Sequence, residues 1–219
     1  MLAAIALSAA APAPLTCGAV IRPGIAERGD DGVWRGAAVD VCRRVASAQY
    51  GAGAPIAFHS YDSLADLHAA SKDRLAFGSQ AELAQTGMRA GPVAAVERQL
   101  LVVRDASPLH AQGELADKKV CFIIGTRAES ALDAWAAASH VRIARLAFQE
   151  PVEMRDAYDV GKCAAMAIDG AEQAEVRGSR VLGPVLVQVP IHVATAGGGD
   201  GQWQRTVAAA VSAGQHARD

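Results

Sequence analysis

Polar side chains follow two apolar stretches of the sequence, at points where strands are expected to end. In "VCFIIGTRAES" (residues 120–130), apolar β-forming residues lead into Gly125 and Thr126 and then into helix-forming residues. In "CAAMAID" an apolar run ends on Asp169. The N–H groups at a helix start favour an anion, whereas an Asp carboxylate favours a cationic group. These residues predict non-covalent binding of a small charged molecule; for Thr126 and Asp169, a purely structural role as helix N-caps is the alternative.

Residue types that could carry catalysis or bind a metal are scattered along the chain. By position, Glu82 and His192 are the candidates for a general acid, but nothing in the sequence pairs them. Glu82 is more typical of a helix start, and His192 of a strand surface. No metal-ligand spacing is present among the remaining histidines, which are His59, His68, His110, His140 and His216. We therefore expect no enzymatic activity, no cofactor and no metal.

The composition is that of a folded, weakly acidic protein. Hydrophobic residues make up 51% of the 219 positions, which is ample for a packed core in one large or two small domains. The formal net charge is −2 and the basic residues are scattered, which argues against nucleic acid as a partner. No apolar run is long enough to span a bilayer comfortably, so we expect at most a peripheral association with a membrane.

The amino-terminal stretch "MLAAIALSAAAPAPLTCG" is apolar, rich in Ala and ends in small residues. It resembles the h-region and cleavage site of a secretory signal, although the positive n-region is missing. We assign residues 1–16 to this signal-like segment and expect an exported protein; a fraying N-terminal helix is the alternative. Cys17 stands where a lipoprotein carries its cysteine, but Pro14 and Thr16 fit that signal poorly.

The state expected for the cysteines depends on the cellular compartment of the protein. An exported protein with an even number of cysteines is expected to form disulfides, whereas a cytosolic protein would keep them as buried thiols. The spacings are neither C-x-x-C nor zinc-like. The four cysteines allow three pairings and are Cys17, Cys42, Cys121 and Cys163.

The first third of the chain alternates between strand and helix patterns. Expected strands are residues 17–22, 55–61 and 75–79, and expected helices are residues 37–50 and 63–74. A polar turn or hairpin with an Asp-Gly turn signal separates the first strand from the first helix. The order β-α-β-α-β is typical of a parallel sheet with crossover helices.

The pattern restarts in the second half. The run "RQLLVVRDA" is a longer strand that leaves the first unit, and "SPLHAQGELADK" is loop-like. Strands are then expected in residues 119–125, 141–148 and 163–169, with helices in residues 126–139 and 150–162. The run "VLVQVPIHVAT" is strand-like, and "GDGQWQRTVAAAVSAGQ" is a closing helix. Two such units predict two lobes, with a ligand beyond the carboxyl ends of their strands.

Three segments carry a family resemblance: "DDGVWRGAAVDVCRRVASAQYG", "KKVCFIIGTRAES" and "MRDAYDVGKCAAMAID", in this order. Together they contain G-x-W-x-G-x-x-V-D-V-C, then V-C…G-T, then G-K-C…D. This combination is similar to the periplasmic solute-binding proteins of polar amino acid ABC transporters, specifically the general L-amino-acid subgroup. The similarity extends from Cys17 to about Gln204.

The resemblance implies an α/β, type II periplasmic-binding-protein-like fold. Each of two lobes would have a central, mainly parallel sheet flanked by helices, and two crossing strands would form the hinge. Lobe one would comprise residues 17–103 and 188–219, and lobe two residues 104–187. The resemblance also implies a Cys121–Cys163 disulfide between neighbouring strands and a Cys17–Cys42 disulfide from the first strand to its following helix. We expect a monomer.

The family also implies positions for a ligand's two charged groups. The family Asp that meets the ligand ammonium corresponds to Asp169 here. The family G-T-T step, whose N–H and hydroxyl groups hold the ligand carboxylate, corresponds to Gly125-Thr126, with Arg127 in place of the second Thr. On the surface, Arg127 would pair with Glu150 or solvent; turned inward, it would add positive charge to the site.

One departure from the family concerns the ligand carboxylate. The family Arg that makes a bidentate contact with this carboxylate is replaced here by Gln80, next to Ser79. A family Glu is replaced by Val189. Loss of a charge-assisted hydrogen bond costs roughly 1.5–3 kcal/mol, so amino-acid binding should weaken by about ten- to a hundredfold. Either Arg22 or Arg127 supplies a replacement cation, or the ligand has no α-carboxylate.

Three functions are consistent with these residues. The first is a periplasmic receptor that clamps a small polar ligand, amino-acid-like or amine-containing, for an ABC permease or a sensor. The second is a degenerate accessory protein that binds another periplasmic protein. The third is an enzyme, because the same fold hosts a periplasmic dehydratase, but the paired acid that catalysis requires is not evident here.

Overall fold

The computed structural model describes residues 13–61, 66, 74–198 and 200–216. Most of the expected signal-like segment and nearly all of the expected helix 63–74 lie outside the described residues. The contacts between Cα atoms divide the chain into two compact units. Unit 1 extends up to Ala95 and resumes at Ile191, and unit 2 is Val96–Pro190. Within the described residues, no helix has the length and apolar character that a bilayer crossing needs.

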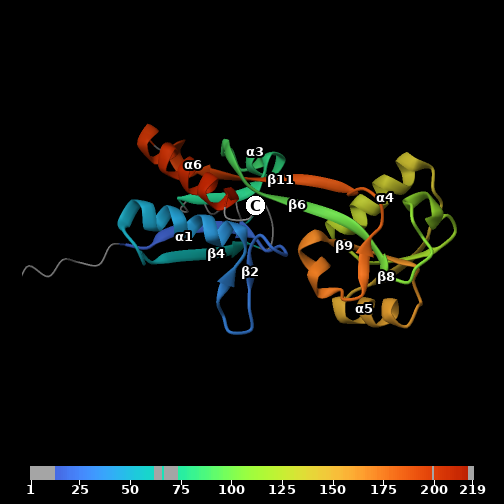
Figure 1. Cartoon of the computed structure of the whole chain (residues 1–219). Coiled ribbons are helices and arrows are strands. Elements are labelled where there is room, and N and C mark those ends of the chain that lie inside the picture. The colour runs from blue at the N-terminus through green and yellow to red at the C-terminus, as the bar shows by residue number, and fades with distance from the viewer. Residues whose placement is uncertain (1–12, 62–65, 67–73, 199, 217–219) are drawn as a thin grey trace, which may run out of the picture. The chain divides into compact units, whose positions relative to one another are not determined.

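Unit 1 is built on a mixed sheet in the order β4-β1-β5-β11 (Figure 1). Strand β1 (Leu15–Val20) lies at its centre, parallel to both β4 (Ile56–Tyr61) and β5 (Leu75–Ser79). Strand β11 (Val187–Thr195) joins β5 in antiparallel register. The expected strand order β-α-β-α-β in this third of the chain therefore produces parallel strands, because crossover connections return the chain in the same direction.

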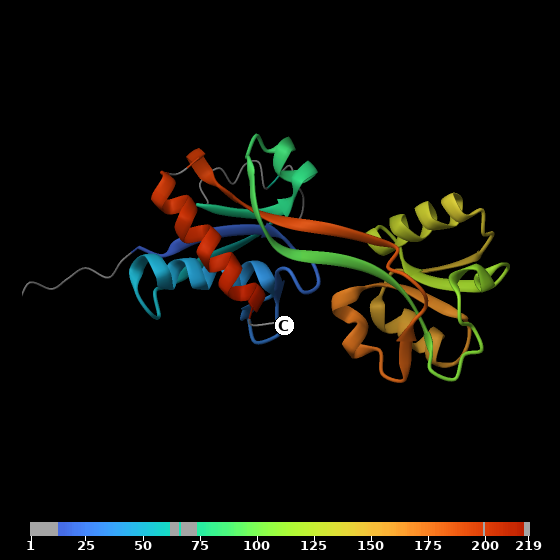
Figure 2. The ribbon, with the colours of Figure 1, turned by 45° about the horizontal axis from the view of Figure 1, so that its top comes forward.

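Helices α1 (Ala37–Tyr50) and α6 (Gly201–His216) pack against each other in unit 1 (Figure 2). The buried positions of α1 include Val39, Cys42 and Ala46, which recur at helical spacing and form its apolar face. Cys42 forms a disulfide with Cys17 of β1, so the helix is bonded covalently to the strand that it covers.

The turn before α1 requires two glycines. Strands β2 (Glu27–Arg28) and β3 (Trp34–Arg35) form the hairpin that the Asp31-Gly32 signal predicts, and Gly32 has a φ of 74°. Gly36 precedes α1 with a φ of 113°, and a Cβ atom there would lie 2.5 Å from the backbone oxygen of Ile25. A side chain at either position would strain this entry into the helix.

Unit 2 contains the sheet β6-β9-β7-β8, with β10 (Ser179–Val181) paired to β6 (Ala90–Arg104). Strands β7 (Lys119–Ile123), β8 (Ala144–Phe148) and β9 (Ala165–Asp169) are mutually parallel, and β6 is antiparallel to β9. Strands β6 and β11 are neighbours in the sheet order, and each crosses the boundary between the units along the chain.

The sheet of unit 2 buries side chains on both faces, because successive residues of a strand point to opposite sides. Leu101, Val120 and Phe122 belong to the cluster that includes α4 (Arg127–Ser139). Leu100 and Met166 belong to the opposite cluster, which includes α5 (Pro151–Asp159). Figure 1 shows α4 and α5 on opposite sides of β9. Because both faces of these strands are buried, their sequences are nearly continuous apolar runs.

Short helices occupy several connections. Helix α3 (Gln80–Gln85) follows β5, η2 (Gly170–Glu175) follows β9, and η3 (Ala196–Gly198) follows β11. The expected loop "SPLHAQGELADK" contains one turn of 3-10 helix, η1 (Gln112–Leu115), in which Leu115 is buried. Cys121 of β7 is bonded to Cys163, which lies just before β9, so both cysteine pairs implied by the family resemblance are disulfides.

Candidate functional site

The carboxyl end of β5 in unit 1 positions a buried carboxylate. Ser79 is the N-cap of α3: its hydroxyl accepts from the backbone N–H of Glu82, and its own N–H donates to Glu82 Oε2 at 2.7 Å. This reciprocal capping box holds the Glu82 side chain over the first turn of the helix. Glu82 is 6% exposed.

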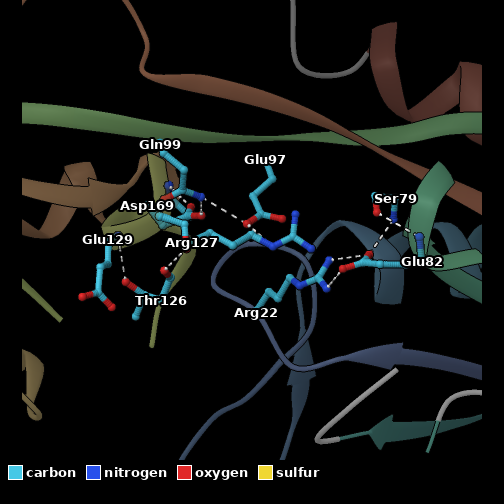
Figure 3. Close-up of polar contacts among 11 residues, drawn as sticks. Arg22, Ser79, Glu82, Glu97, Gln99, Thr126, Arg127, Glu129 and Asp169 are labelled. Carbon is cyan, nitrogen blue, oxygen red and sulfur yellow. Dashed lines mark hydrogen bonds and ion pairs between the residues drawn. The ribbon is translucent and has the colours of Figure 1, made fainter. Parts of the chain in front are cut away.

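Arg22 meets this carboxylate in a two-pronged ion pair. Its Nη1 donates to Glu82 Oε2 at 3.1 Å, and its Nη2 donates to Glu82 Oε1. The two side chains are 12% and 8% exposed, so the guanidinium and the carboxylate are both largely removed from water. Removing either partner would take a directly opposed charge away from a largely buried one, which is costly. Figure 3 shows the Arg22 fork on Glu82.

Asp169 of unit 2 lies at the carboxyl end of β9 and is fixed by two hydrogen bonds. Gln99 of β6 is its antiparallel partner, and Gln99 Nε2 donates to Asp169 Oδ2 at 2.8 Å. Asp169 Oδ1 accepts from the N–H of Ala171 at 2.9 Å, which makes Asp169 the N-cap of η2. The carboxylate is half-buried, and its two oxygens retain lone pairs for a further donor.

A second carboxylate lies on the same face of β6, two residues before Gln99. Glu97 is 4% exposed, and its Oε1 accepts from Gln99 Nε2 at 3.1 Å. Arg127 approaches the same oxygen with Nε at 3.4 Å. We call Glu97, Gln99, Arg127 and Asp169 the β6–β9 cluster. It contains two carboxylates and one guanidinium group and therefore carries a net charge of about −1 at neutral pH.

The N-terminus of α4 is capped by its own residues. Thr126 is the N-cap, with its hydroxyl donating to the backbone oxygen of Ile123 at 2.7 Å and accepting from the N–H of Glu129. Glu129 Oε2 accepts from the N–H of Gly125 at 2.7 Å. Its other oxygen accepts from Arg145 Nη2 at 2.5 Å. The anion expected at this helix start is thus supplied by the protein itself.

Glu172 adds to the negative potential around Asp169. Its Oε2 accepts from the backbone N–H of Asp169 at 3.1 Å, completing the capping box of η2. Burial raises the pKa of the Glu172 carboxyl above its ordinary value, and the nearby Asp169 charge acts in the same direction. Burial and the Asp169 charge therefore both disfavour the ionised form of the Glu172 carboxyl.

The sequence-predicted residues that make these contacts fall into two groups, one in each unit. Thr126, Arg127 and Asp169 lie in unit 2, at or just after the ends of adjacent parallel strands. Arg22 and Ser79 lie in unit 1, where both contact Glu82.

Three other residues considered from the sequence lie apart from these contacts. Gln80, at the position of the family Arg, is exposed in the first turn of α3. Val189 is partly buried in β11, and Glu150 is the exposed residue that precedes α5. A neutral amide and an apolar side chain thus stand where the family resemblance implies an Arg and a Glu.

Sequence reasoning missed the partners that hold these residues. Glu97 and Gln99 are absent from the sequence-based predictions, and Glu82 is predicted only as a general acid or helix-start residue. For Arg127 the expected surface partner is Glu150, whereas the structure places the guanidinium against Glu97. The polar interruption Glu97-Arg98-Gln99, in a strand that is apolar on either side of it, is the signal that could have identified them, because residues two apart share one face of a strand.

The candidates for catalysis have other contacts. Glu82 is bound to Arg22 and to the backbone of Ser79, and His192 Nδ1 lies 2.8 Å from the backbone oxygen of Gly91. Across the ranges that the structure describes, no cluster of His, Cys, Asp and Glu side chains is suited to hold a metal ion. The arrangement offers charged hydrogen-bonding groups rather than an acid–base pair.

No protein-family model matches the sequence, and no curated protein does so either. Solved structures match its fold. A periplasmic binding protein from Brucella ovis with glutathione bound is 21% identical with a TM-score of 0.66; the match covers 89% of this chain but only 65% of that protein.

Two further matches cover nearly all of both chains. The second substrate-binding domain of a putative amino acid ABC transporter from Streptococcus pneumoniae gives a TM-score of 0.72 at 13% identity, covering 93% of this chain and 94% of that one. Substrate-binding domain 2 of GlnP from Lactococcus lactis, in an open conformation, gives 0.70 at 14% identity, covering 92% and 89%. The chain therefore has the α/β fold of type II periplasmic binding proteins, at low sequence identity to those of amino acid ABC transporters.

Proposed function

We propose that this chain is an extracytoplasmic solute-binding protein that clamps a small polar ligand, amino-acid-like or amine-containing, between two lobes. The observation that carries the proposal is Asp169, a carboxylate fixed at the carboxyl end of a central parallel strand with acceptor capacity to spare. In open parallel sheets, ligands bind beyond these strand ends. The fold, which solved binding proteins of amino acid transporters share, supports the same role.

The proposal extends to the location, the lobes and the partners of the protein. Two disulfides support an oxidising compartment, such as the periplasm, after export. Lobe one would comprise residues 17–103 and 188–219 and lobe two residues 104–187, with β6 and β11 as the hinge. The protein would act as a monomer and deliver its ligand to an ABC permease or a sensor.

A thermal-shift screen tests this function. The protein is unfolded with its disulfides intact and refolded to remove any ligand that co-purifies, and is then melted with amino acids, amines and organic acids in turn. A ligand at a hundredfold excess over its Kd stabilises the folded state by about 2.7 kcal/mol, which raises Tm by roughly 5–10 °C for a chain of this length. A screen in which no compound of any class raises Tm would rule out the solute-binding function.

A degenerate accessory protein remains the second candidate, and the contacts of unit 1 favour it. Gln80 carries no charge where the family has an Arg, and Arg22 is already bound to Glu82. Such a protein would bind a periplasmic protein partner instead of an amino acid. It is distinguished by a blank solute screen together with stable co-elution of the purified chain with a purified partner in size-exclusion chromatography.

A further inference from the structure

We infer that the ligand is an organic amine without a carboxylate group. This inference rests on the proposed function and specifies the class of ligand. It follows from an account of which hydrogen-bond donors and cations at the strand ends are engaged by carboxylates of the protein itself. Each unit is considered separately.

In unit 2, two donors that could receive a ligand carboxylate, the N–H of Gly125 and the guanidinium of Arg127, already contact one. The N–H of Gly125, at the start of α4, donates to Glu129 Oε2 at 2.7 Å. Glu129 is in turn held by Arg145 at 2.5 Å, so it is not a loosely placed side chain. The guanidinium of Arg127 lies 3.4 Å from the buried Glu97 carboxylate. A ligand carboxylate that approached either of these two donors would meet a carboxylate of the protein already there, and like charges repel.

In unit 1, the same is true of the β5 strand end. The N–H of Ser79 donates to Glu82 Oε2 at 2.7 Å, and both terminal nitrogens of Arg22 donate to the Glu82 carboxylate. Because the pair is buried, exchanging Glu82 for a ligand carboxylate would leave Glu82 desolvated and without its cation. Arg22 therefore cannot replace the family Arg, at whose position this chain has Gln80, as the cation for a ligand carboxylate.

The hydrogen-bond acceptors of unit 2, in contrast, favour a positively charged group on the ligand. Asp169 is oriented by Gln99 and by the N–H of Ala171, which leaves lone pairs for one or two donors of an ammonium group. The β6–β9 cluster is net negative, and Glu172 lies against the backbone of Asp169. Figure 3 shows the Arg127 side chain extended toward Glu97, with Gln99 between Glu97 and Asp169. A positively charged group of the ligand would compensate the net negative charge of the β6–β9 cluster. A carboxylate on the ligand would be repelled by that charge.

Matched pairs of compounds test the inference on the unaltered protein. Isothermal titration calorimetry compares arginine with agmatine, ornithine with putrescine, and phenylalanine with 2-phenylethylamine; within each pair only the carboxylate differs. We expect at least one amine to bind, and to bind at least about tenfold tighter than its parent amino acid, which is the scale of one charged hydrogen bond.

The outcomes separate the inference from the function on which it rests. An amino acid that binds as tightly as its amine, or more tightly, overturns the inference and leaves the solute-binding function standing. Binding of an organic acid without an amine does the same. Absence of binding for amino acids, amines and organic acids alike overturns both.

Two variants locate the effect. Asp169→Asn keeps an acceptor for the η2 cap, since Asn is a good N-cap, and should weaken amine binding by about ten- to a hundredfold. Asp117→Asn is the matched control, because Asp117 is exposed, lies in unit 2 and has a φ of 55°, which Asn tolerates. Equal loss of amine affinity in both variants overturns the inference, provided that their melting curves show folded protein.

Glu129→Gln tests the other half of the argument. Removing the negative charge from the start of α4 should improve the affinity of the parent amino acid relative to its amine by several-fold, about the range that a helix-terminus charge contributes. An unchanged ratio of the two affinities shows that Glu129 does not exclude the ligand carboxylate and overturns that step.

Discussion

Gln99 of β6 and Asp169 of β9 lie directly opposite each other in antiparallel register, joined by a hydrogen bond of 2.8 Å from the Gln99 amide to the Asp169 carboxylate. The same amide nitrogen donates to Glu97 at 3.1 Å. One neutral side chain therefore holds two carboxylates that would otherwise repel each other. Both Gln99 and Glu97 are buried, so no water-exposed group substitutes easily for this amide.

We predict that Gln99→Leu lowers the free energy of unfolding by about 1–3 kcal/mol, because it leaves two carboxylates without a shared donor in a buried setting. Urea denaturation at pH 7 measures the loss. Gln173→Leu, at an exposed position of η2, is the control and should change stability by less than about 0.5 kcal/mol. Equal stabilities for the two variants would contradict the role given to Gln99.

Breaking the Arg22–Glu82 pair should be costly. Arg22→Met removes the guanidinium that faces the buried Glu82 carboxylate, with an expected loss of about 3–5 kcal/mol. The double variant Arg22→Met/Glu82→Gln should recover part of this loss, and the coupling follows from a double-mutant cycle in urea. The exposed pair Arg155–Glu175, at 2.8 Å, is the control; Arg155→Met should cost at most about 1 kcal/mol. If Arg22→Met and Arg155→Met lower the free energy of unfolding by the same amount, burial does not make the Arg22–Glu82 pair more important for stability than an exposed pair.

Each disulfide should stabilise its own unit. The bonds Cys17–Cys42 and Cys121–Cys163 span 25 and 42 residues, for which the chain-entropy relation gives about 3.5 and about 4 kcal/mol. Replacing either pair with Ala should lower Tm by roughly 7–16 °C. Calorimetric melting with and without a reductant measures the effect. The variant lacking all four cysteines should be insensitive to the reductant, and any residual response would point to an effect other than disulfide reduction.

Glu172 should impose a pH dependence on stability. Its pKa is raised by burial above its ordinary value of 4.5, so the folded state binds this proton more tightly than the unfolded state. That contribution is fully present below pH 4.5 and is lost as the pH rises through the folded pKa. Glu172→Gln should therefore gain stability relative to the parent between pH 4 and pH 7, measured by urea denaturation across that range.

Glu114 provides the comparison of opposite sign. Hydrogen bonds from the backbone N–H groups of His110 and Ala111 hold the pKa of the Glu114 carboxyl below its ordinary value. Its contribution is present above that ordinary value and is lost as the pH falls through the folded pKa. Glu114→Gln should therefore lose stability relative to the parent as the pH rises. Parallel pH profiles for Glu114→Gln and Glu172→Gln would contradict both assignments.

Local patterns predicted most of the elements and the helix starts. The Asp31-Gly32 signal predicts the β2–β3 hairpin, and Thr126 and Asp169 are N-caps, as the structural alternative for each residue proposed. These features depend on a few neighbouring residues, whose hydrogen bonds are fixed by turn and cap geometry. Strand β6 was less predictable: it begins at Ala90, before the expected run, because Gly91 and Pro92 resemble a strand boundary.

The contacts of the site were beyond local patterns. Arg22 and Glu82 are 60 residues apart, and Gln99 and Asp169 are 70 apart, so strand order and register decide whether they meet. Neither is readable from a single sequence at the level of individual residues. The ligand roles of Asp169, Thr126, Gln80, Arg127 and Ser79 therefore stay predictions, and the pairing of Arg22 with Glu82 changes what Arg22 can do for a ligand.

Unit 2 is one continuous segment, whereas unit 1 is assembled from both ends of the chain. During synthesis from the amino terminus, every residue of unit 2 is available before Ile191 has been added. Unit 1 still lacks its antiparallel strand β11 and the helix α6 that covers α1 at that stage. Because domains generally form as cooperative units once their residues are present, we expect unit 2 to complete its contacts first, and unit 1 to complete its own only after β11 and α6 have been added.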